Sequence, residues 1–298
     1  MTRHAILIAG PTASGKSTLA LSLAQKVHGE IINADSMQVY RDLRILSARP
    51  TQAEEMALPH HLFGFVDAEQ EYSVGQFLRD LLPVLADCRA RDKTPILVGG
   101  TGLYFMAMTQ GLADIPPVPV AIKQEIDGWK LEGPALHAVL QSRDPKMAAR
   151  LELADTQRIE RALGVYMATG LSLSDWWDRG TATALLPPGT WRGVMLDPGR
   201  DRLNATIDSR FIAMIAEGAL DEVRALAIRK LPRNRGIMKA HGVPHLVQHI
   251  DGLLPLDDAI RRGQADTRRY AKRQRTFYRH KLTGFGSVDQ LLQEILTT

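Results

Sequence analysis

Eight residues near the start of the chain have the types and spacing of a phosphate-binding loop. The pattern G-x-x-x-x-G-K-[ST] is matched in full by Gly10, Pro11, Thr12, Ala13, Ser14, Gly15, Lys16 and Ser17. The glycines let the backbone curl so that successive N–H groups point at phosphate oxygens, and the Lys16 ammonium neutralises their charge. The Ser17 hydroxyl is placed to ligate Mg²⁺. The motif therefore predicts a bound polyphosphate with Mg²⁺ as cofactor.

The loop alone does not identify a reaction. Enzymes that hydrolyse nucleotides also need an acidic residue at the end of an apolar strand, which holds Mg²⁺. The matching apolar run here, residues 95–98, is followed by Gly99 and Gly100 and carries no carboxylate. This absence weakens an ATPase or GTPase interpretation and leaves room for a diphosphate that departs as a leaving group.

Asp35 is the first acidic residue beyond the second predicted strand, residues 30–33. In open α/β sheets, ligands bind beyond the carboxyl ends of the strands. A carboxylate at that place can accept a proton from an attacking amine. It can also serve as a helix N-cap or form an Asx turn. Position alone favours neither the general-base role nor the capping role.

Basic residues are concentrated in the last third of the chain. Residues 223–250 contain no Asp or Glu, and residues 261–281 contain nine Lys and Arg, opposed only by Asp266. This density favours a nucleic-acid backbone over a solvated helix face, with Arg269 and Arg273 as candidate contacts. The interleaved aromatic residues are spaced as in a buried stripe: Tyr270, Phe277 and Tyr278.

Strand and helix signals alternate in the first hundred residues. We predict strands at 5–9, 30–33, 95–98 and 191–196, and helices at 18–27 and from an N-cap at Ser73 toward Arg91. This order predicts an α/β fold whose P-loop NTPase-like core has a parallel sheet. A small all-helical insertion domain and a helical C-terminal region complete it.

A proline-rich linker at 115–119 interrupts the pattern, and residues 121–188 show only helical signals. The clearest helix runs over 155–169 and ends at Gly170. We therefore expect three segments. These are residues 1–114 (the first part of the core), 115–190 (the helical insertion domain) and 191–298 (the core continuation with the basic helical region).

Composition sets broad limits on the 298-residue chain. Its 45% hydrophobic and 23% charged residues are typical of a globular protein. No apolar run is long enough for a membrane span, and a single cysteine, Cys88, permits no internal disulfide. We expect a cytoplasmic monomer. His60 and His61 have no Cys or carboxylate at ligand spacing, so we interpret them as structural.

Several further motifs resemble the tRNA dimethylallyltransferases, also called tRNA isopentenyltransferases. After the loop they follow in the family's order and span nearly the whole chain: residues 35–41, 59–62, 72–74, 95–104, 157–158 with 161–163, and 267–274. Ordered motifs of this number are far more specific than one phosphate loop.

The resemblance implies an enzyme that transfers a dimethylallyl group from dimethylallyl diphosphate to tRNA. The acceptor would be the N6 amine of the adenosine at position 37, beside the anticodon. It implies Asp35 as general base, Thr101 near the reacting groups and Arg210 on the diphosphate. The contacts it implies with the tRNA, partly from the insertion domain, are Asp35, Ser36, Met37, Gln38, Thr101, Lys123, Gln157, Arg158, Ile159, Glu160 and Arg161.

Two segments depart from the family pattern. Residues 46–51 keep a basic residue but lose a glycine and a hydroxyl, and Lys123 stands where an arginine is common. Residues 239–244 differ enough that the resemblance implies no particular tRNA contact for them.

Three other functions remain open. A relative that prenylates free adenine nucleotides would use the same loop and base, but would have no use for the basic C-terminal half. A small-molecule P-loop kinase lacks support because no carboxylate closes the third strand. A non-catalytic RNA-binding module would not need the complete loop, Asp35 and Thr101.

Overall fold

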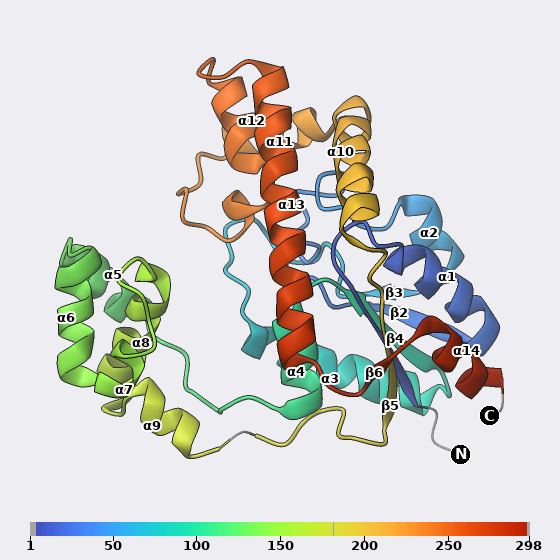
Figure 1. Ribbon diagram of the computed structural model, residues 1–298, viewed down its shortest axis with the longest axis horizontal. Helices are drawn as coiled ribbons and strands as arrows, with labels where there is room; N and C mark the ends of the chain where they lie inside the picture. Colours follow the sequence, from blue (N-terminus) through green and yellow to red (C-terminus); the bar gives the residue numbers. More distant parts are fainter. Residues whose placement is uncertain (1–3, 181, 297–298) are drawn as a thin grey trace. The chain divides into compact units, whose positions relative to one another are not determined.

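The computed structural model describes residues 4–180 and 182–296 of the chain (Figure 1). It contains two compact units: Met1–Thr109 with Leu185–Thr298, and Gln110–Ala184. The sequence predicts the corresponding boundaries at 114/115 and 190/191. The outermost residues of the first and last expected segments, 1–3 and 297–298, lie outside the described residues.

Unit 1 is built on a six-stranded, wholly parallel sheet with the order β3-β2-β4-β1-β5-β6. The strands are β1 Ala5–Ala9, β2 Gly29–Asn33, β3 His60–His61, β4 Thr94–Gly99, β5 Trp191–Met195 and β6 Phe285–Gly286. The predicted α/β fold is confirmed, and the four predicted strands are correct to within one residue. β3 and β6 were missed because a strand of two residues leaves no periodic pattern.

Three strands end together at one edge of the sheet. In the register, Ala9 of β1 lies opposite Gly99 of β4, and Asn33 of β2 lies opposite Val98. A Cβ atom on Gly99 would lie 2.1 Å from the Ala34 carbonyl, so only glycine allows the chain after β2 to approach so closely. The phosphate loop, Asp35 and Thr101 each follow one of these strand ends.

The helices of unit 1 cover the sheet and extend beyond it (Figure 1). They are α1 Lys16–Val27, α2 Gln52–Ala57, α3 Val74–Ala90, α4 Gly102–Gln110, α10 Arg200–Ala216, α11 Ala219–Ile228, the 3-10 helix η1 Ile237–Lys239, α12 Val243–Ile250, α13 Leu256–Lys281 and α14 Val288–Leu296. Ser73 caps α3 through a capping box with Gln76, as predicted, and Pro83 lies inside that helix. The predicted helical C-terminal region is confirmed, apart from β6.

Unit 2 contains only helices among its described residues: α5 Val120–Gly128, α6 Gly133–Arg143, α7 Pro145–Ala148, α8 Thr156–Thr169 and α9 Leu173–Asp178. They share a core that includes Leu136, Leu140 and Leu163. Gly170 ends α8 with φ 72°, as predicted. Over the described part of the chain, none of the helices is both long and apolar enough to cross a bilayer.

Candidate active site

A cavity of about 630 Å³ lies at the edge of the sheet where β1, β2 and β4 end. Its lining includes residues 12–17 of the phosphate loop and Asp35, which follows β2. Arg210 of α10 lines another part of it. Groups that are far apart in the sequence therefore share one space inside unit 1.

The loop has the features of an anion site. Gly15 takes φ 88° just before α1, and no described side chain caps this helix. The first N–H groups of α1 therefore have no intrahelical acceptor and point toward the loop. The Ser14 hydroxyl is buried and has no hydrogen-bond partner among the described residues. Phosphate oxygens would satisfy both kinds of donor.

Lys16 reaches back across the loop, and its Nζ donates to the Pro11 carbonyl over 2.6 Å. Burial lowers the pKa of Lys16 to about 8, with Asp35 acting against this shift and Arg210 adding to it. The charged ammonium is therefore costly at this place, and an anion beside it would offset that cost.

The geometry of Asp35 is compatible with both roles that the sequence left open, a turn-forming residue and a general base. Its Oδ1 accepts a hydrogen bond from the Met37 N–H (2.9 Å), and its own N–H donates to Asn33 Oδ1 (2.8 Å). These bonds fix a local turn. No described residue donates to Oδ2, so that oxygen remains available to a substrate. A turn role and a base role are thus compatible in one carboxylate.

A second, smaller cavity of about 80 Å³ shares Asp35 and Arg210 with the first. Most of its remaining wall is apolar and comes from Met37, Leu46, Ile207, Phe211, Met214 and Ala240, with His241 and Tyr270. This cavity suits a small apolar group held next to a carboxylate.

His241 is a site residue that the sequence did not reveal. Its ring lies 4.5 Å from that of Tyr270, and burial, followed by the Arg273 charge, lowers its pKa. The ring is therefore neutral at pH 7. No tRNA contact is carried over from the family for residues 239–244, and in the structure Ala240 and His241 line the small cavity. The only signal was that this segment departs from the family pattern.

Thr101 holds the segment after β2 and is not among the residues that line either cavity. Its Oγ1 accepts from the Ser36 N–H (2.9 Å), and its hydroxyl donates to Ser36 Oγ (3.2 Å). Gln38 lines the large cavity, where its amide donates to the Ser47 and Ala48 carbonyls.

Arg210 lines both cavities, and burial lowers the pKa of its guanidinium while the Glu217 and Asp35 charges raise it. The cations of Lys16 and Arg210 therefore face one space, which Arg44 and Arg49 also line. Preorganised positive groups of this kind stabilise charge that develops on a leaving diphosphate.

The residues present also fit a magnesium ion. Ser17 is exposed at the start of α1 and lines the cavity. Its hydroxyl is an oxygen ligand of the kind Mg²⁺ prefers, and diphosphate oxygens and water would complete the shell. β4 ends without a carboxylate, so Mg²⁺ would depend on the diphosphate oxygens for much of its binding.

The predicted tRNA contacts at 123 and 157–161 belong to unit 2. Lys123 is on α5, and residues 157–161 form the first turns of α8. Gln157, Arg158 and Arg161 are exposed, with Arg158 paired to Asp155 at 3.1 Å. Ile159 is fully buried, and its side chain packs in the core of the unit.

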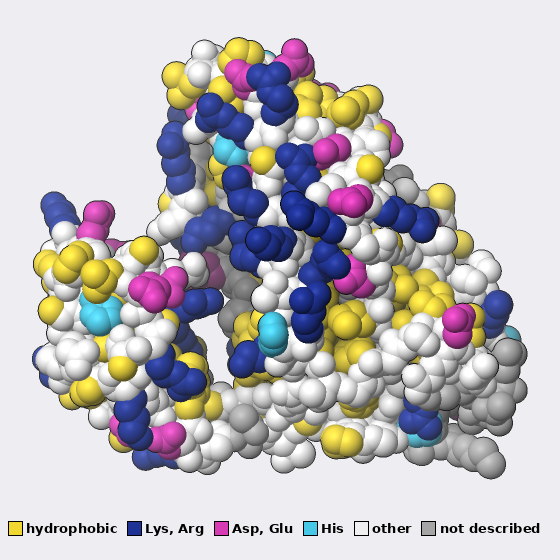
Figure 2. Space-filling model, in the orientation of Figure 1, with side chains coloured by type: hydrophobic (Ala, Val, Ile, Leu, Met, Phe, Trp, Pro, Cys, Tyr) yellow, Lys and Arg dark blue, Asp and Glu magenta, His cyan; other side chains and the backbone are white. Residues whose placement is uncertain are grey.

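A basic groove of about 500 Å³ runs between α10 and α13. The described residues that line it include no Asp or Glu, and six of them are basic: Arg200, Arg268, Arg269, Lys272, Arg275 and Arg279. Figure 2 shows Lys and Arg side chains gathered along α13. Arg273 lies over the Tyr270 ring, 5.7 Å from its centre.

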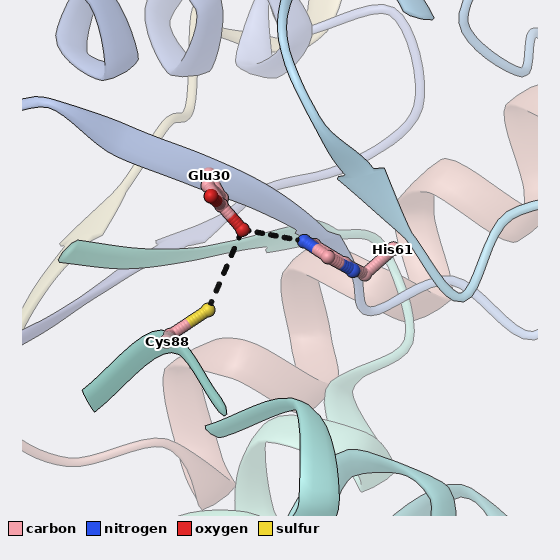
Figure 3. Close-up of side chains that lie close together, drawn as sticks. All are labelled: Glu30, His61 and Cys88. Carbon is pink, nitrogen blue, oxygen red and sulfur yellow. Dashed lines mark hydrogen bonds and ion pairs between the residues drawn. The ribbon is translucent and has the colours of Figure 1, made fainter. Parts of the chain in front are cut away.

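Folding also places a carboxylate and a thiol beside His61 (Figure 3). His61 Nε2 lies 2.7 Å from Glu30 Oε2, and Cys88 Sγ lies 3.8 Å from the same oxygen. However, Arg91 binds both oxygens of Glu30, and burial raises the pKa of the Cys88 thiol to about 11. A neutral thiol and a paired carboxylate are poor metal ligands. The cluster therefore has a structural role, which joins β2, β3 and α3.

We expect Glu30→Gln to lower the free energy of unfolding by about 2 kcal/mol at pH 7, because charged hydrogen bonds to Arg91 and His61 are lost. The pKa of Glu30 is lowered to about 2 from 4.5, chiefly by Arg91. The stabilisation is therefore present above pH 4.5 and disappears as pH falls toward 2. Urea unfolding of both proteins at pH 7 and pH 3 measures this. A constant difference at both pH values would contradict the charged pairing.

Comparisons with known proteins agree with one another. The model of a family described as IPP transferase matches residues 38–281, and one described as isopentenyl transferase matches residues 3–60. A tRNA dimethylallyltransferase of Methylocella silvestris is 54% identical over 284 residues, covering 94% of this chain and 93% of that protein. One from Azorhizobium caulinodans is 49% identical and covers 99% and 95%.

Two solved structures share the fold. The full-length tRNA isopentenylpyrophosphate transferase from Bacillus halodurans has a TM-score of 0.66 and 31% identity, covering 100% of this chain and 95% of that one. A eukaryotic dimethylallyltransferase acting on tRNA has a TM-score of 0.78 and 29% identity, covering 93% and 70%.

Proposed function

The chain belongs to the IPP transferase family, and from that premise we propose that it is a tRNA dimethylallyltransferase whose reaction takes place beside Asp35. It transfers a dimethylallyl group from dimethylallyl diphosphate to the N6 amine of a tRNA adenosine and releases diphosphate. We place that adenosine at position 37, beside the anticodon. The observation that carries the proposal is the single cavity that Asp35 shares with Lys16 and Arg210.

The donor diphosphate binds in the loop of residues 10–17. As the bond to the allylic carbon breaks, negative charge grows on the bridging oxygen. The loop N–H groups, Lys16 and Arg210 stabilise that charge. Mg²⁺, held by Ser17 and the phosphate oxygens, would add further positive charge there when bound.

The acceptor amine approaches from the Asp35 side. As its nitrogen bonds to the allylic carbon, Asp35 Oδ2 accepts the proton that the amine loses. Thr101 acts on this step through Ser36, since their hydrogen bonds fix the backbone next to Asp35. The small apolar cavity beside Asp35 suits the five-carbon dimethylallyl group, which is kept away from water there.

The adenine must leave its stack to reach Asp35. In a single-stranded loop this costs less than in a duplex. We therefore propose that the base is flipped inward, while the tRNA backbone lies along the basic groove. Exposed residues of α8 and Lys123 on α5 would contact the tRNA from unit 2.

Reversing Arg269 and Arg273 to Glu is expected to weaken tRNA binding and flatten its salt dependence, because each lost phosphate contact removes roughly one unit of slope. Arg273 should contribute more, since Arg269 already pairs with Asp266. Filter binding between about 50 and 200 mM salt measures both effects. Lys26→Glu, an exposed charge reversal in α1, is the control. Unchanged binding would remove this part of α13 from the footprint.

The activity itself is tested by incubating the protein with dimethylallyl diphosphate, Mg²⁺ and unmodified tRNA, followed by mass analysis of the nucleosides. We expect prenylated adenosine at position 37 and little turnover of AMP. Turnover of AMP alone would instead indicate an enzyme for free nucleotides. We propose that the protein acts as a monomer, and the tRNA substrate supports a cytoplasmic enzyme.

A further inference from the structure

Gln274 is a buried amide on the inner face of the basic helix α13. Only 4% of the residue is exposed, and it is not among the residues that line the two cavities beside Asp35. Its Oε1 accepts the Thr12 N–H over 3.0 Å, and its Nε2 donates to the Gly100 carbonyl over 2.7 Å. One side chain therefore joins the phosphate loop to the turn after β4.

The bond to Thr12 fixes a peptide group that also contacts Lys16. The Thr12 N–H and the Pro11 carbonyl belong to the same planar peptide and point in opposite directions. Gln274 binds the N–H, and the Lys16 ammonium binds the carbonyl over 2.6 Å. Any rotation of this peptide would move the oxygen that holds Lys16, so the amide sets the position of the ammonium.

The bond to Gly100 brings Gln274 close to Asp35. A Cβ atom on Gly100 would lie 2.4 Å from Gln274 Nε2 and 3.0 Å from Asp35 Oδ2, so the three groups are closely packed. The next residue, Thr101, holds Ser36. Burial and the Asp35 charge raise the pKa of the nearby Tyr270 hydroxyl, while its hydrogen bonds to Thr101 and Gln274 lower it.

We infer that Gln274 is a positioning residue for the transfer reaction, which acts through the Pro11–Thr12 peptide on Lys16. It never touches the substrates. Its amide is needed because one end must accept a hydrogen bond and the other must donate one. This inference rests on the role proposed above for Lys16.

A double-mutant cycle with Lys16 tests this inference. Gln274→Met keeps the length of the side chain but removes its hydrogen bonds to Thr12, Gly100 and Tyr270. We expect it to slow single-turnover transfer roughly tenfold, the effect of losing one good hydrogen bond in the transition state. In a Lys16→Met background, we expect the same change to alter the rate by less than about twofold. The affinity for tRNA should stay unchanged in both backgrounds.

A merely structural role gives a different result, because Gln274→Met would then slow the reaction by the same factor in both backgrounds. Glu30→Gln, at the other end of β2, serves as the destabilising control whose effect is independent of Lys16. If Gln274→Met does not fold, Gln274→Ala replaces it in the same cycle. The inference is overturned if Gln274→Met slows the reaction by the same factor in both backgrounds. It is also overturned if the Gln274→Met single variant keeps the wild-type rate. A Lys16→Met protein with full activity would instead overturn the role of the phosphate loop.

Discussion

Replacement of Asp35 by Ala should slow prenyl transfer by roughly two to four orders of magnitude, the usual contribution of a positioned general base. An amine that attacks carbon must lose a proton, and the Asp35 carboxylate lines the cavity with its Oδ2 bound to no described protein donor. The affinities for donor and tRNA should change little, because the phosphate loop and the basic groove are untouched.

Asp35→Asn separates the two roles of this residue. Asparagine keeps an oxygen that can accept the Met37 N–H, and so preserves the turn, but it cannot take up a proton. Single-turnover rates measured with saturating tRNA should be low for both variants. A rate for Asp35→Asn near that of the wild type, with a low rate for Asp35→Ala, would show that the turn alone matters.

Lys16→Met is expected to lower the rate of transfer roughly a hundredfold, because a preorganised cation opposite the departing diphosphate is removed. The same substitution should increase the stability of the folded protein. The pKa of Lys16 falls from 10.5 to about 8 on folding, so its charged form is disfavoured in the folded state. Stability of the wild type should therefore rise as pH increases from about 8 to 10.5, and the variant should lack this rise.

Single-turnover kinetics at pH 7 and urea unfolding between pH 7 and 10 measure the two effects. Lys26→Met is the matched control, since Lys26 is an exposed lysine in the last turn of the same helix. Loss of activity that is accompanied by a large loss of stability at pH 7 would mean that Lys16 supports the fold. The proposed role on the diphosphate would then lose its support.

The parts of the site that the sequence predicted are those whose chemistry is local. A phosphate loop needs consecutive residues with a strand before and a helix after, so residues 10–17 are recognisable by themselves. Asp35 was found because it follows a buried strand, and parallel strands end at one edge. The caps of α3 and α8 are likewise set by residues a few positions apart.

The parts of the site that the sequence did not predict depend on contacts between residues far apart in the chain. Gln274 binds Thr12 across 262 positions and Gly100 across 174, and no local pattern marks such a pair. Cys88 and Glu30 reach His61 only because α3 packs beside β2 and β3. His241 enters the small cavity from a segment with no recognisable motif. Ile159 matched a motif position, but the helix turns it into the core.

The position of the acceptor base shows whether Asp35 takes the proton from adenine N6. It is observed in a crystal structure of the full chain with an unmodified anticodon stem-loop and a non-reactive thio analogue of dimethylallyl diphosphate. We predict the analogue's diphosphate in the loop of residues 10–17 and the adenine out of its stack, with N6 about 3 Å from the Asp35 carboxylate. An adenine that stays stacked in the anticodon loop while both ligands are bound would rule out Asp35 as the base for this amine.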